Sequence, residues 1–313
     1  MQRLLNDFGA VFDLSHRVGS APLIELVEQT IVRLEDHPLE DWGTEGRRQR
    51  TVTKDERFVR FHYRPHLFPG MDLKLMLAHK LQFHLLPREL PPGSPLAVAA
   101  VLESYCHLSG DLFGWEMLRD GKFLVWIVDM AGHGLRAGLG SAVIKVLIDN
   151  LEERSRLETM LAELNRRLHE CIRPEHDSLF ATAFFMTLDR DGRAIYSSAG
   201  HPPVLLRRAN GRIDKLDPLE RPLGLFPDTT YTSREFRLNP LDFVLLYTDG
   251  LIEARGRDDE AFGLDRLRGI LAGRFDRCPE LTGAIYGEIS GRQDIDKLDD
   301  DVTFLAARLS VQG

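Results

Sequence analysis

Asp129 stands directly after an apolar run, Phe123–Val128, and before a glycine-rich turn that contains His133. The run is rich in β-branched and aromatic side chains, which are typical of a buried central strand. Gly132 and Gly134 allow the chain to turn sharply behind it. A carboxylate at the tip of a rigid strand is well placed to bind a metal or to transfer a proton. An isolated aspartate at such a position more often forms a turn or caps a helix.

The same arrangement recurs elsewhere in the chain. Asp249 follows the apolar run Phe243–Tyr247, Asp300 precedes another strand-like run, and Asp111 lies in a short polar gap. Four acids at strand margins suggest one convergent carboxylate cluster, and aspartates alone suit hard cations such as magnesium or manganese better than zinc. Two such ions about 3.5–4 Å apart can lower the pKa of a shared water and clamp a phosphoryl oxygen. The sequence has no Walker loop, GxGxxG or GxSxG motif, which disfavours kinases, dinucleotide enzymes and serine hydrolases.

Length and composition restrict the possible classes of protein. The chain has 313 residues and a formal net charge of −8, which fits one large domain, or a domain with an appendage, and argues against a general nucleic-acid surface. The cysteines, Cys106, Cys171 and Cys278, lie far apart and form no zinc or disulfide pattern. No run reaches the roughly 20 apolar residues of a membrane span, and the N-terminus lacks a signal-peptide core. We therefore expect a soluble, cytoplasmic protein.

The chain divides into three parts. Residues 1–70 form an N-terminal segment for which we expect a regulatory role, residues 71–92 a linker, and residues 93–313 the main domain. The stretch Met71–Leu86 is apolar on nearly all sides, so a helix there should be buried on more than one face, and Pro87 ends it. Two interpretations stay open: a plain core helix, or a switch helix that dimerises and carries a signal into the main domain.

The pattern of elements predicts an α+β fold. Strands are expected at Leu96–Ser104, Lys122–Val128, Ala181–Leu188, Ala194–Ser198, Val204–Arg207, Phe243–Tyr247 and Val302–Leu309, with a weaker one at Arg57–Tyr63, and hairpin turns at Asp189–Gly192 and Arg208–Gly211. Helices are expected near 135–150, 154–171 and 264–289, the last broken near Pro279. Many antiparallel strands with a few grouped helices indicate helices layered on sheets.

Seven short motifs follow one another in an order that resembles a known family. They are Leu81–Pro87, Ser109–Phe113, Asp129–Gly134, Ser198–Pro203, Tyr247–Ala254, Phe262–Gly263 and Asp300–Thr303. Each motif is weak alone, whereas the ordered set is specific and spans residues 81–309. The chain resembles the SpoIIE-type serine phosphatases, a bacterial branch of the metal-dependent PPM (type 2C-like) protein phosphatases.

The resemblance implies a PPM-type α-β-β-α sandwich, in which two antiparallel sheets pack face to face between helices. It also implies two Mn²⁺ or Mg²⁺ ions. Asp129 matches the acid that bridges both ions, and the Met130 carbonyl matches a backbone ligand. Asp249 and Asp300 match the acids of the second metal site, and Asp111 matches the acid of the first motif.

The first motif departs from the family pattern at three positions. Ser109 replaces a glycine, Leu112 an aromatic residue and Gly114 the final acid. Glu116 lies two residues further on and is a candidate replacement for that acid. Arg136 stands where the family often has a small residue, either as a cation for substrate phosphate or simply on the following helix. Asp301 falls where the wider superfamily often has asparagine, so we interpret it as a neighbour of the metal ligands.

Two histidines lie in family motifs. His133 is a candidate proton donor to the leaving seryl oxygen, because an imidazole changes protonation near neutral pH. The alternative is that His133 fixes the glycine turn through a backbone bond. For His201, in a Gly-His-Pro-Pro loop, we expect a structural role.

The resemblance implies a metal-dependent phosphatase that hydrolyses phosphoserine or phosphothreonine on a protein. The usual substrate in the family is a STAS-domain anti-sigma-factor antagonist in a partner-switching pathway, and the N-terminal segment and linker helix suggest a homodimer. Two other functions remain open. One is a PPM-fold scaffold with little or no catalysis, which the altered first motif favours, and the other is a hydrolase of small phosphoesters.

Overall fold

The structure is a computed structural model that describes residues 58–62, 78–79, 81–82, 84–87, 89–106, 108–171, 179–292 and 298–310, and only the backbone of 58–62. Most of the expected N-terminal segment, 1–70, and the start of the expected linker helix lie outside the described residues. The part of that helix that is described, between residues 78 and 85, is helical.

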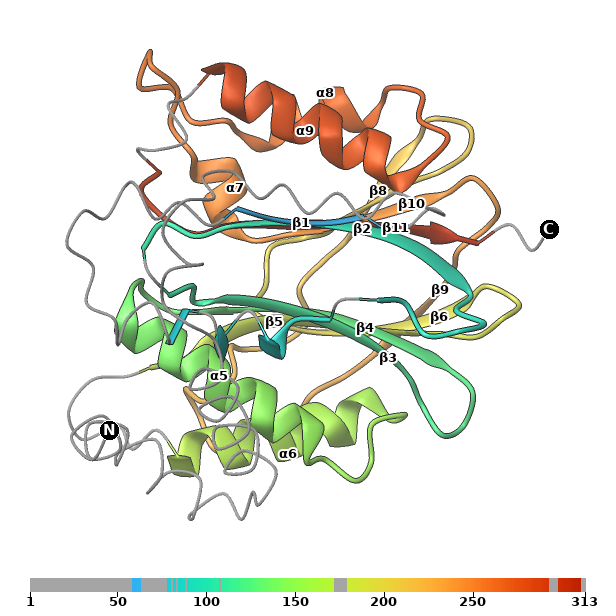
Figure 1. Ribbon diagram of the computed structural model, residues 1–313. Coiled ribbons are helices and arrows are strands. Elements are labelled where there is room, and N and C mark those ends of the chain that lie inside the picture. The colour runs from blue at the N-terminus through green and yellow to red at the C-terminus, as the bar shows by residue number, and fades with distance from the viewer. Residues whose placement is uncertain are drawn as a thin grey trace, which may run out of the picture.

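Two β-sheets pack face to face between two layers of helices (Figure 1). The six-stranded sheet has the order β1 (Phe58–His62), β2 (Leu96–Glu103), β11 (Val302–Leu309), β10 (Phe243–Tyr247), β7 (Val204–Arg207) and β8 (Ile213–Leu216). The five-stranded sheet has the order β3 (Asp111–Met117), β4 (Phe123–Met130), β5 (Ala181–Leu188), β6 (Arg193–Ala199) and β9 (Arg234–Arg237). Every strand pair is antiparallel except β1 and β2, which run parallel. This arrangement is the α-β-β-α sandwich that the family resemblance implies, with β1 added to one edge.

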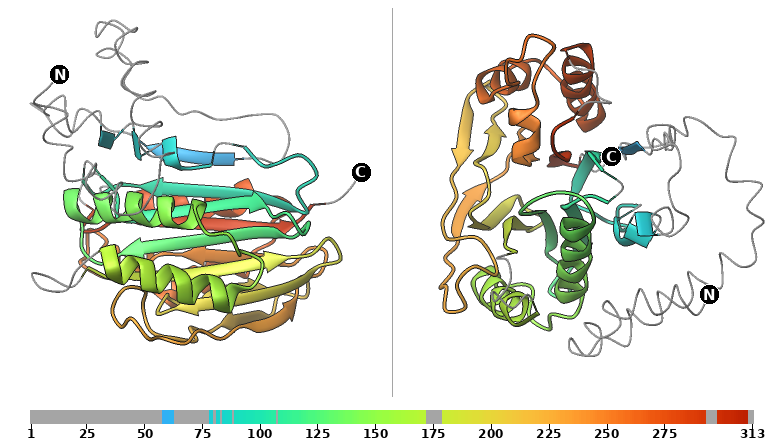
Figure 2. Two further views of the ribbon diagram at one scale, coloured as in Figure 1. Left: turned by 90° about the horizontal axis from the view of Figure 1, so that it is seen from below. Right: turned by 90° about the vertical axis from the view of Figure 1, so that its left-hand side faces the viewer.

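The helices cover the outer face of each sheet, as the two further views also show (Figure 2). They are α5 (Leu135–Asp149) and α6 (Leu157–Cys171) on the five-stranded sheet, and α7 (Asp249–Glu253), α8 (Leu264–Leu271) and α9 (Cys278–Arg292) on the six-stranded sheet. Within the described ranges, no helix combines the length and the apolarity that a bilayer crossing requires.

The core divides along these layers. One buried cluster lies between the two sheets and beneath α5 and α6, and it includes Phe184, Phe113 and Ile127. A second cluster joins the outer face of the six-stranded sheet to α7–α9 through side chains such as Phe304 and Leu281. Burial of these side chains is the main favourable contribution to folding, and it holds the strands that carry the four acids in fixed positions.

The predicted hairpins are confirmed. The turn Asp189–Gly192 joins β5 to β6, and the turn Arg208–Gly211 joins β7 to β8. Gly192 adopts a φ of 84°, and a Cβ atom there would lie 2.3 Å from the carbonyl oxygen of Leu238. Glycine is required at this turn for both reasons.

Four short elements escaped the sequence analysis: β3, β8, β9 and α7. The interval that was interpreted as a polar gap around Asp111 is in fact the start of β3, which pairs with β4 along its whole length. The motif Ser109-Gly110-Asp111 obscured this strand, because serine, glycine and aspartate are typical of turns. The other three elements have five residues or fewer, too short for a periodic pattern to stand out.

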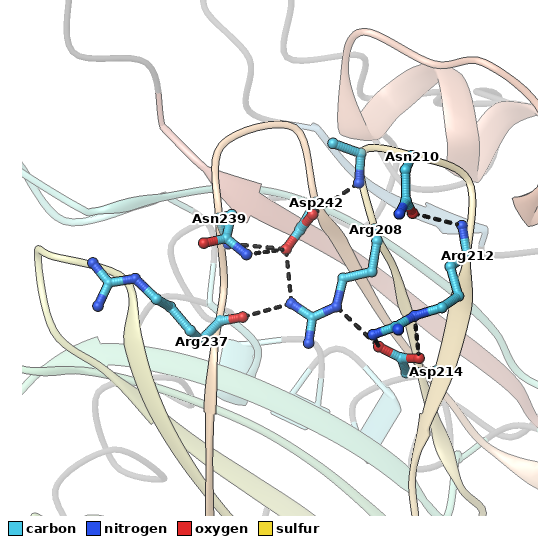
Figure 3. A network of polar contacts seen from close by, with 8 residues as sticks. Arg208, Asn210, Arg212, Asp214, Arg237, Asn239 and Asp242 are labelled. Carbon is cyan, nitrogen blue, oxygen red and sulfur yellow. Dashed lines mark hydrogen bonds and ion pairs between the residues drawn. The ribbon is translucent and has the colours of Figure 1, made fainter.

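At one end of the sandwich, a polar network ties the turn after β7 to the turn before β10 (Figure 3). Asp242 is 1% exposed, and its carboxylate accepts hydrogen bonds from the backbone N–H groups of Ala209 and Asn239, each at 2.9 Å. It also accepts one from the Asn239 side chain at 3.2 Å and pairs with Arg208 at 3.0 Å. Arg208 reaches Asp214 as well, at 2.9 Å. The buried charge of Asp242 is therefore fully compensated.

Replacing Asp242 should destabilise the fold without changing the four candidate metal-binding acids at the other end of the sandwich. Asp242→Ala leaves two backbone N–H groups without their acceptor and removes one of the two carboxylates that pair with Arg208, which costs about 3 kcal/mol and lowers the unfolding temperature by about 6–12 °C. Thermal unfolding followed by circular dichroism measures this. Asp228→Ala, at an exposed loop position, is the matched control and should unfold like the wild type. Equal unfolding temperatures for both variants would contradict this role of Asp242.

Candidate metal centre

The four predicted acids meet at the end of the sandwich opposite to Asp242. Asp111 on β3 and Asp129 on β4 are direct partners in the strand register. Asp249 begins α7 immediately beyond β10, and Asp300 lies just before β11, the strand that pairs with β10. The facing sheets thus bring two acids from each sheet to one place, as the sequence predicts.

The four carboxylates repel one another. Burial raises the pKa of Asp129 to about 8, with contributions from the charges of Asp249, Asp300 and Asp301 and from the hydrogen bond that protonated Asp129 donates to Asp249. Burial raises the pKa of Asp111 well above its usual range, and the charges of Asp129 and Asp301 add to the effect. The pKa of Asp300 is also raised, chiefly by partial burial of its carboxyl group. Negative charge at this end is therefore costly unless cations compensate it.

Thr248 connects Asp111 to the opposite sheet. The Thr248 hydroxyl donates to the Asp111 carboxylate at 2.8 Å and accepts the backbone N–H of Thr303 at 3.1 Å. The Thr248 N–H donates in turn to the Thr303 carbonyl at 2.9 Å. The hydroxyl also lies 3.4 Å from the Thr303 carbonyl oxygen. Its shorter contact is with the Asp111 carboxylate, so its proton is best used there and holds that carboxylate between the sheets.

The Asp301 carboxylate binds the loop that precedes β3 through hydrogen bonds. Its two carboxylate oxygens accept the backbone N–H groups of Tyr105 and Gly110, both at 2.7 Å, and the Ser104 hydroxyl at 3.2 Å. Burial raises the pKa of Asp301 to about 6, against the opposing effect of these hydrogen bonds. A Cβ atom on Gly250 would lie 2.0 Å from the Asp301 carbonyl, so the turn after β10 can approach this segment only with glycine.

Gln82 ties the N-terminal helix to the same loop. Its side chain accepts the backbone N–H of Ser109 at 2.9 Å and donates to the Ser109 carbonyl and, at 2.9 Å, to the Ser141 hydroxyl. Gln82 is 5% exposed, so these bonds lie away from water. The helix at 78–85 therefore contacts the residue two positions before Asp111.

The two motif histidines differ in environment. His133 is exposed at the rim, and its ring lies 5.1 Å from that of Tyr105 in an edge-to-face contact. Its charge partly opposes the effect of burial that raises the pKa of Asp300. His201 is fully buried, one ring nitrogen lies 3.0 Å from the Thr182 hydroxyl, and burial lowers its pKa to about 3. His201 is therefore a neutral packing group, whereas His133 is accessible from solvent.

The packing of the strands explains why glycine, rather than the family's acid, stands at position 114. Side chains alternate between the two faces of a strand, so position 114 faces away from Asp111, and the ring of Trp126 covers it: a Cβ atom there would lie 2.2 Å from that ring. Glu116 does not replace the missing acid. It lies about 17 Å along the strand from Asp111 and pairs with Arg154 at 2.7 Å.

The donor set fits hard divalent cations. Asp111 is buried, Asp129 and Asp249 are half-buried, and Asp300 is exposed at the rim. Their carboxylates and a backbone carbonyl at the end of β4 are the oxygen ligands that Mg²⁺ and Mn²⁺ prefer. A cation also offsets the charge repulsion that raises the pKa values of Asp111 and Asp129. In the described part of the chain, no three acidic, imidazole or thiol side chains form a closed ligand set; Asp129 and Asp249 are hydrogen-bonded to each other instead.

Comparison with known proteins gives a consistent result. The family model Stage II sporulation protein E (SpoIIE) matches residues 119–310. Phosphoserine phosphatase RsbU of Bacillus subtilis is 26% identical over 242 residues, which cover 76% of this chain and 70% of RsbU. Phosphoserine phosphatase RsbP of the same species is 27% identical over 187 residues, 58% of this chain and 45% of RsbP. The solved SiaA-PP2C domain of Pseudomonas aeruginosa has a TM-score of 0.65 at 22% identity and covers 75% of this chain and 96% of that domain.

The sandwich with its acids at one end is thus the fold of PP2C-type domains. Within that class, the chain belongs to the SpoIIE family, because the family model matches more than half of it. Asp111 lies before the matched region, and the other three acids lie within it. The chain spans less than half the length of two curated relatives, 45% of RsbP and 41% of Protein IcfG of Synechocystis.

The hydroxyl of Thr248 should control metal affinity. Thr248→Val removes a hydrogen bond to a charged group, which contributes about 1.5–3 kcal/mol, so we expect Mn²⁺ binding to weaken about tenfold or more in titration calorimetry. Thr248→Ser keeps the hydroxyl and should retain most of the affinity. Thr187→Val changes a buried threonine at the far end of β5 and serves as the control. A folded Thr248→Val protein with wild-type affinity would show that this hydroxyl does not position Asp111.

Proposed function

We propose that the chain is a metal-dependent serine/threonine protein phosphatase that hydrolyses phosphoserine on a regulatory protein. The observation that carries this proposal is the convergence of four carboxylates at one end of the sandwich, with the pKa of Asp129 raised to about 8. Membership of the SpoIIE family and similarity to two named phosphoserine phosphatases support it.

In this proposal two Mn²⁺ or Mg²⁺ ions bind at the acids. Asp111, Asp129, Asp249, Asp300 and the Met130 carbonyl would hold these ions. By the family resemblance, Asp129 would serve both ions, Asp249 and Asp300 would serve the second, and Asp111 would supply the acid of the first motif. When bound, such ions lower the pKa of a water and stabilise negative charge on a phosphoryl group.

The chain's own residues orient these ligands and supply a proton. Thr248 fixes the Asp111 carboxylate, and Asp301 holds the backbone of Gly110, which precedes Asp111. His133 is exposed beside Asp300, where its imidazole can donate a proton to the leaving seryl oxygen. The seryl oxygen is a poor leaving group as an alkoxide, which is strongly basic, so its departure requires such a proton.

The proposed substrate is a phosphorylated STAS-domain anti-sigma-factor antagonist in the cytoplasm. Support comes from the relatives RsbU and RsbP and from a solved Mycobacterium tuberculosis structure described as containing RsbU and RsbW domains, which is 27% identical to this chain with a TM-score of 0.56. Residues 1–70 and the helix within 71–92 would regulate the domain at 93–313 and would form a homodimer.

Hydrolysis of an aryl phosphate with and without roughly 2 mM MnCl₂ tests the enzyme and its centre together. We expect manganese-dependent release that Asp129→Asn reduces by at least about 100-fold. The variant should unfold close to the wild-type temperature, because the asparagine amide can donate to Asp249 as protonated Asp129 does. Asp228→Asn, at an exposed position, is the control. Full activity of Asp129→Asn, or activity that persists in excess EDTA, would overturn the site assignment.

Two further comparisons separate the alternatives. A phosphorylated STAS protein hydrolysed much faster than free phosphoserine supports a protein phosphatase, whereas the reverse order supports a hydrolase of small phosphoesters. A PPM-fold scaffold would bind the phosphoprotein and release no phosphate under any of these conditions. The altered first motif favours the scaffold, but Gly114 faces away from the acids.

A further inference from the structure

Two arginines on the outer face of the six-stranded sheet are almost fully buried. Arg207 ends β7 and is 7% exposed, and Arg308 lies near the end of β11 and is 6% exposed. The Nε atom of Arg207 is buried without a hydrogen-bond partner. Across the described ranges, neither guanidinium forms an ion pair with a carboxylate. The adjacent Arg208 contrasts with them, because it pairs with two acids.

Both guanidinium groups lie against one aromatic ring. Phe243 on β10 is the register partner of Arg207, and Arg308 lies on the other neighbouring strand, next to the pair Val244–Ala307. The Cζ atoms of Arg207 and Arg308 are 5.9 Å and 5.4 Å from the centre of the Phe243 ring. Arg207, Phe243 and Arg308 thus form a row across β7, β10 and β11 on the face covered by α8 and α9.

Within the described part of the chain, no carboxylate pairs with either guanidinium of this row, and the Nε atom of Arg207 is buried without a hydrogen-bond partner. The ring of Phe243 attracts each cation without cancelling its charge. The start of helix α9 lies nearby, because the Cys278 thiol contacts the Ala97 carbonyl and Ala97 pairs with Arg308. The acid in that first turn, Glu280, pairs instead with Arg277 at 3.0 Å.

We propose that Arg207 and Arg308 form a binding site for a dianion of the phosphate class. Two guanidinium groups require two negative charges, which a phosphate or sulfate supplies and a single carboxylate does not. Their Cα atoms are two strand spacings, about 10 Å, apart, and long side chains leaning toward one ring can both reach a tetrahedral oxyanion. The site lies at the opposite end of β10 from Asp249, so it is separate from the acids and does not depend on the proposed phosphatase activity.

The test uses the full chain in excess EDTA, where the acid cluster repels anions. In titration calorimetry, inorganic phosphate and sulfate should bind, whereas acetate at matched ionic strength should not. Arg207→Met and Arg308→Met keep the apolar stems and should each weaken phosphate binding at least about tenfold. Arg268→Met removes one positive charge at an exposed position on α8 and should bind phosphate like the wild type. Arg207→Met should keep the wild-type circular dichroism spectrum and unfold cooperatively on heating, which shows that it is folded.

A second measurement needs no variant. In ¹⁵N spectra of the wild-type chain, the Nε–H resonance of Arg207 should shift on addition of phosphate and stay in place on addition of acetate. The proposal is overturned if phosphate does not bind, if acetate binds equally well, or if binding is unchanged in both Arg→Met variants. It is also overturned if phosphate binds without moving the Arg207 resonance.

Discussion

The acid end of this molecule depends on one electrostatic constraint: carboxylates that face one another between two sheets repel. The repulsion is evident in the pKa of Asp129, raised to about 8, and in that of Asp111, raised well above its usual range. Flexible loops would relieve such repulsion by moving apart. Here the acids sit on or beside strands whose positions are fixed by two buried clusters on either side of the six-stranded sheet. The stability of the sandwich therefore keeps the acids together despite their repulsion. A bound cation would offset part of this repulsion and stabilise the folded state.

The two ends of the sandwich differ in how far the negative charges of their aspartates are compensated by hydrogen-bond donors. At the end of the sheet away from the acids, the Asp242 carboxylate accepts two backbone N–H groups and the Asn239 side chain and pairs with Arg208, so it is a structural group. At the acid end, Thr248 and the backbone supply donors to Asp111 and Asp301, while the partner of Asp129 among the described residues is another acid, Asp249. Uncompensated charge at a buried position is unfavourable for folding alone, and it marks the places where a ligand of opposite sign binds well.

The sequence predicted the strands and acids well and the supporting contacts poorly. Strands such as β4 and β10 were visible as continuous apolar runs, and their terminal acids were recognisable by position. The face-to-face packing of two sheets came from the family resemblance, and the order of the strands was not predicted, since local patterns do not specify which strands pair. Thr248 donates to an acid 137 positions away, and Gln82 contacts a serine 59 positions away. A buried threonine or glutamine has no sequence signature of its own, so these contacts became visible only in the folded chain.

The first motif shows why a departure from a family pattern need not mean decay of a site. Gly114 lacks the expected acid, but its position is covered by Trp126, which stacks on Phe185 at a ring distance of 6.0 Å. An acid introduced there alone would clash with the indole ring, so the glycine and the tryptophan belong to one packing arrangement. A site that had lost its function would be free to lose its supporting donors as well. Instead the Thr248 hydroxyl and the Gly110 N–H still reach their carboxylates at 2.8 and 2.7 Å, which favours a catalytic domain over a scaffold.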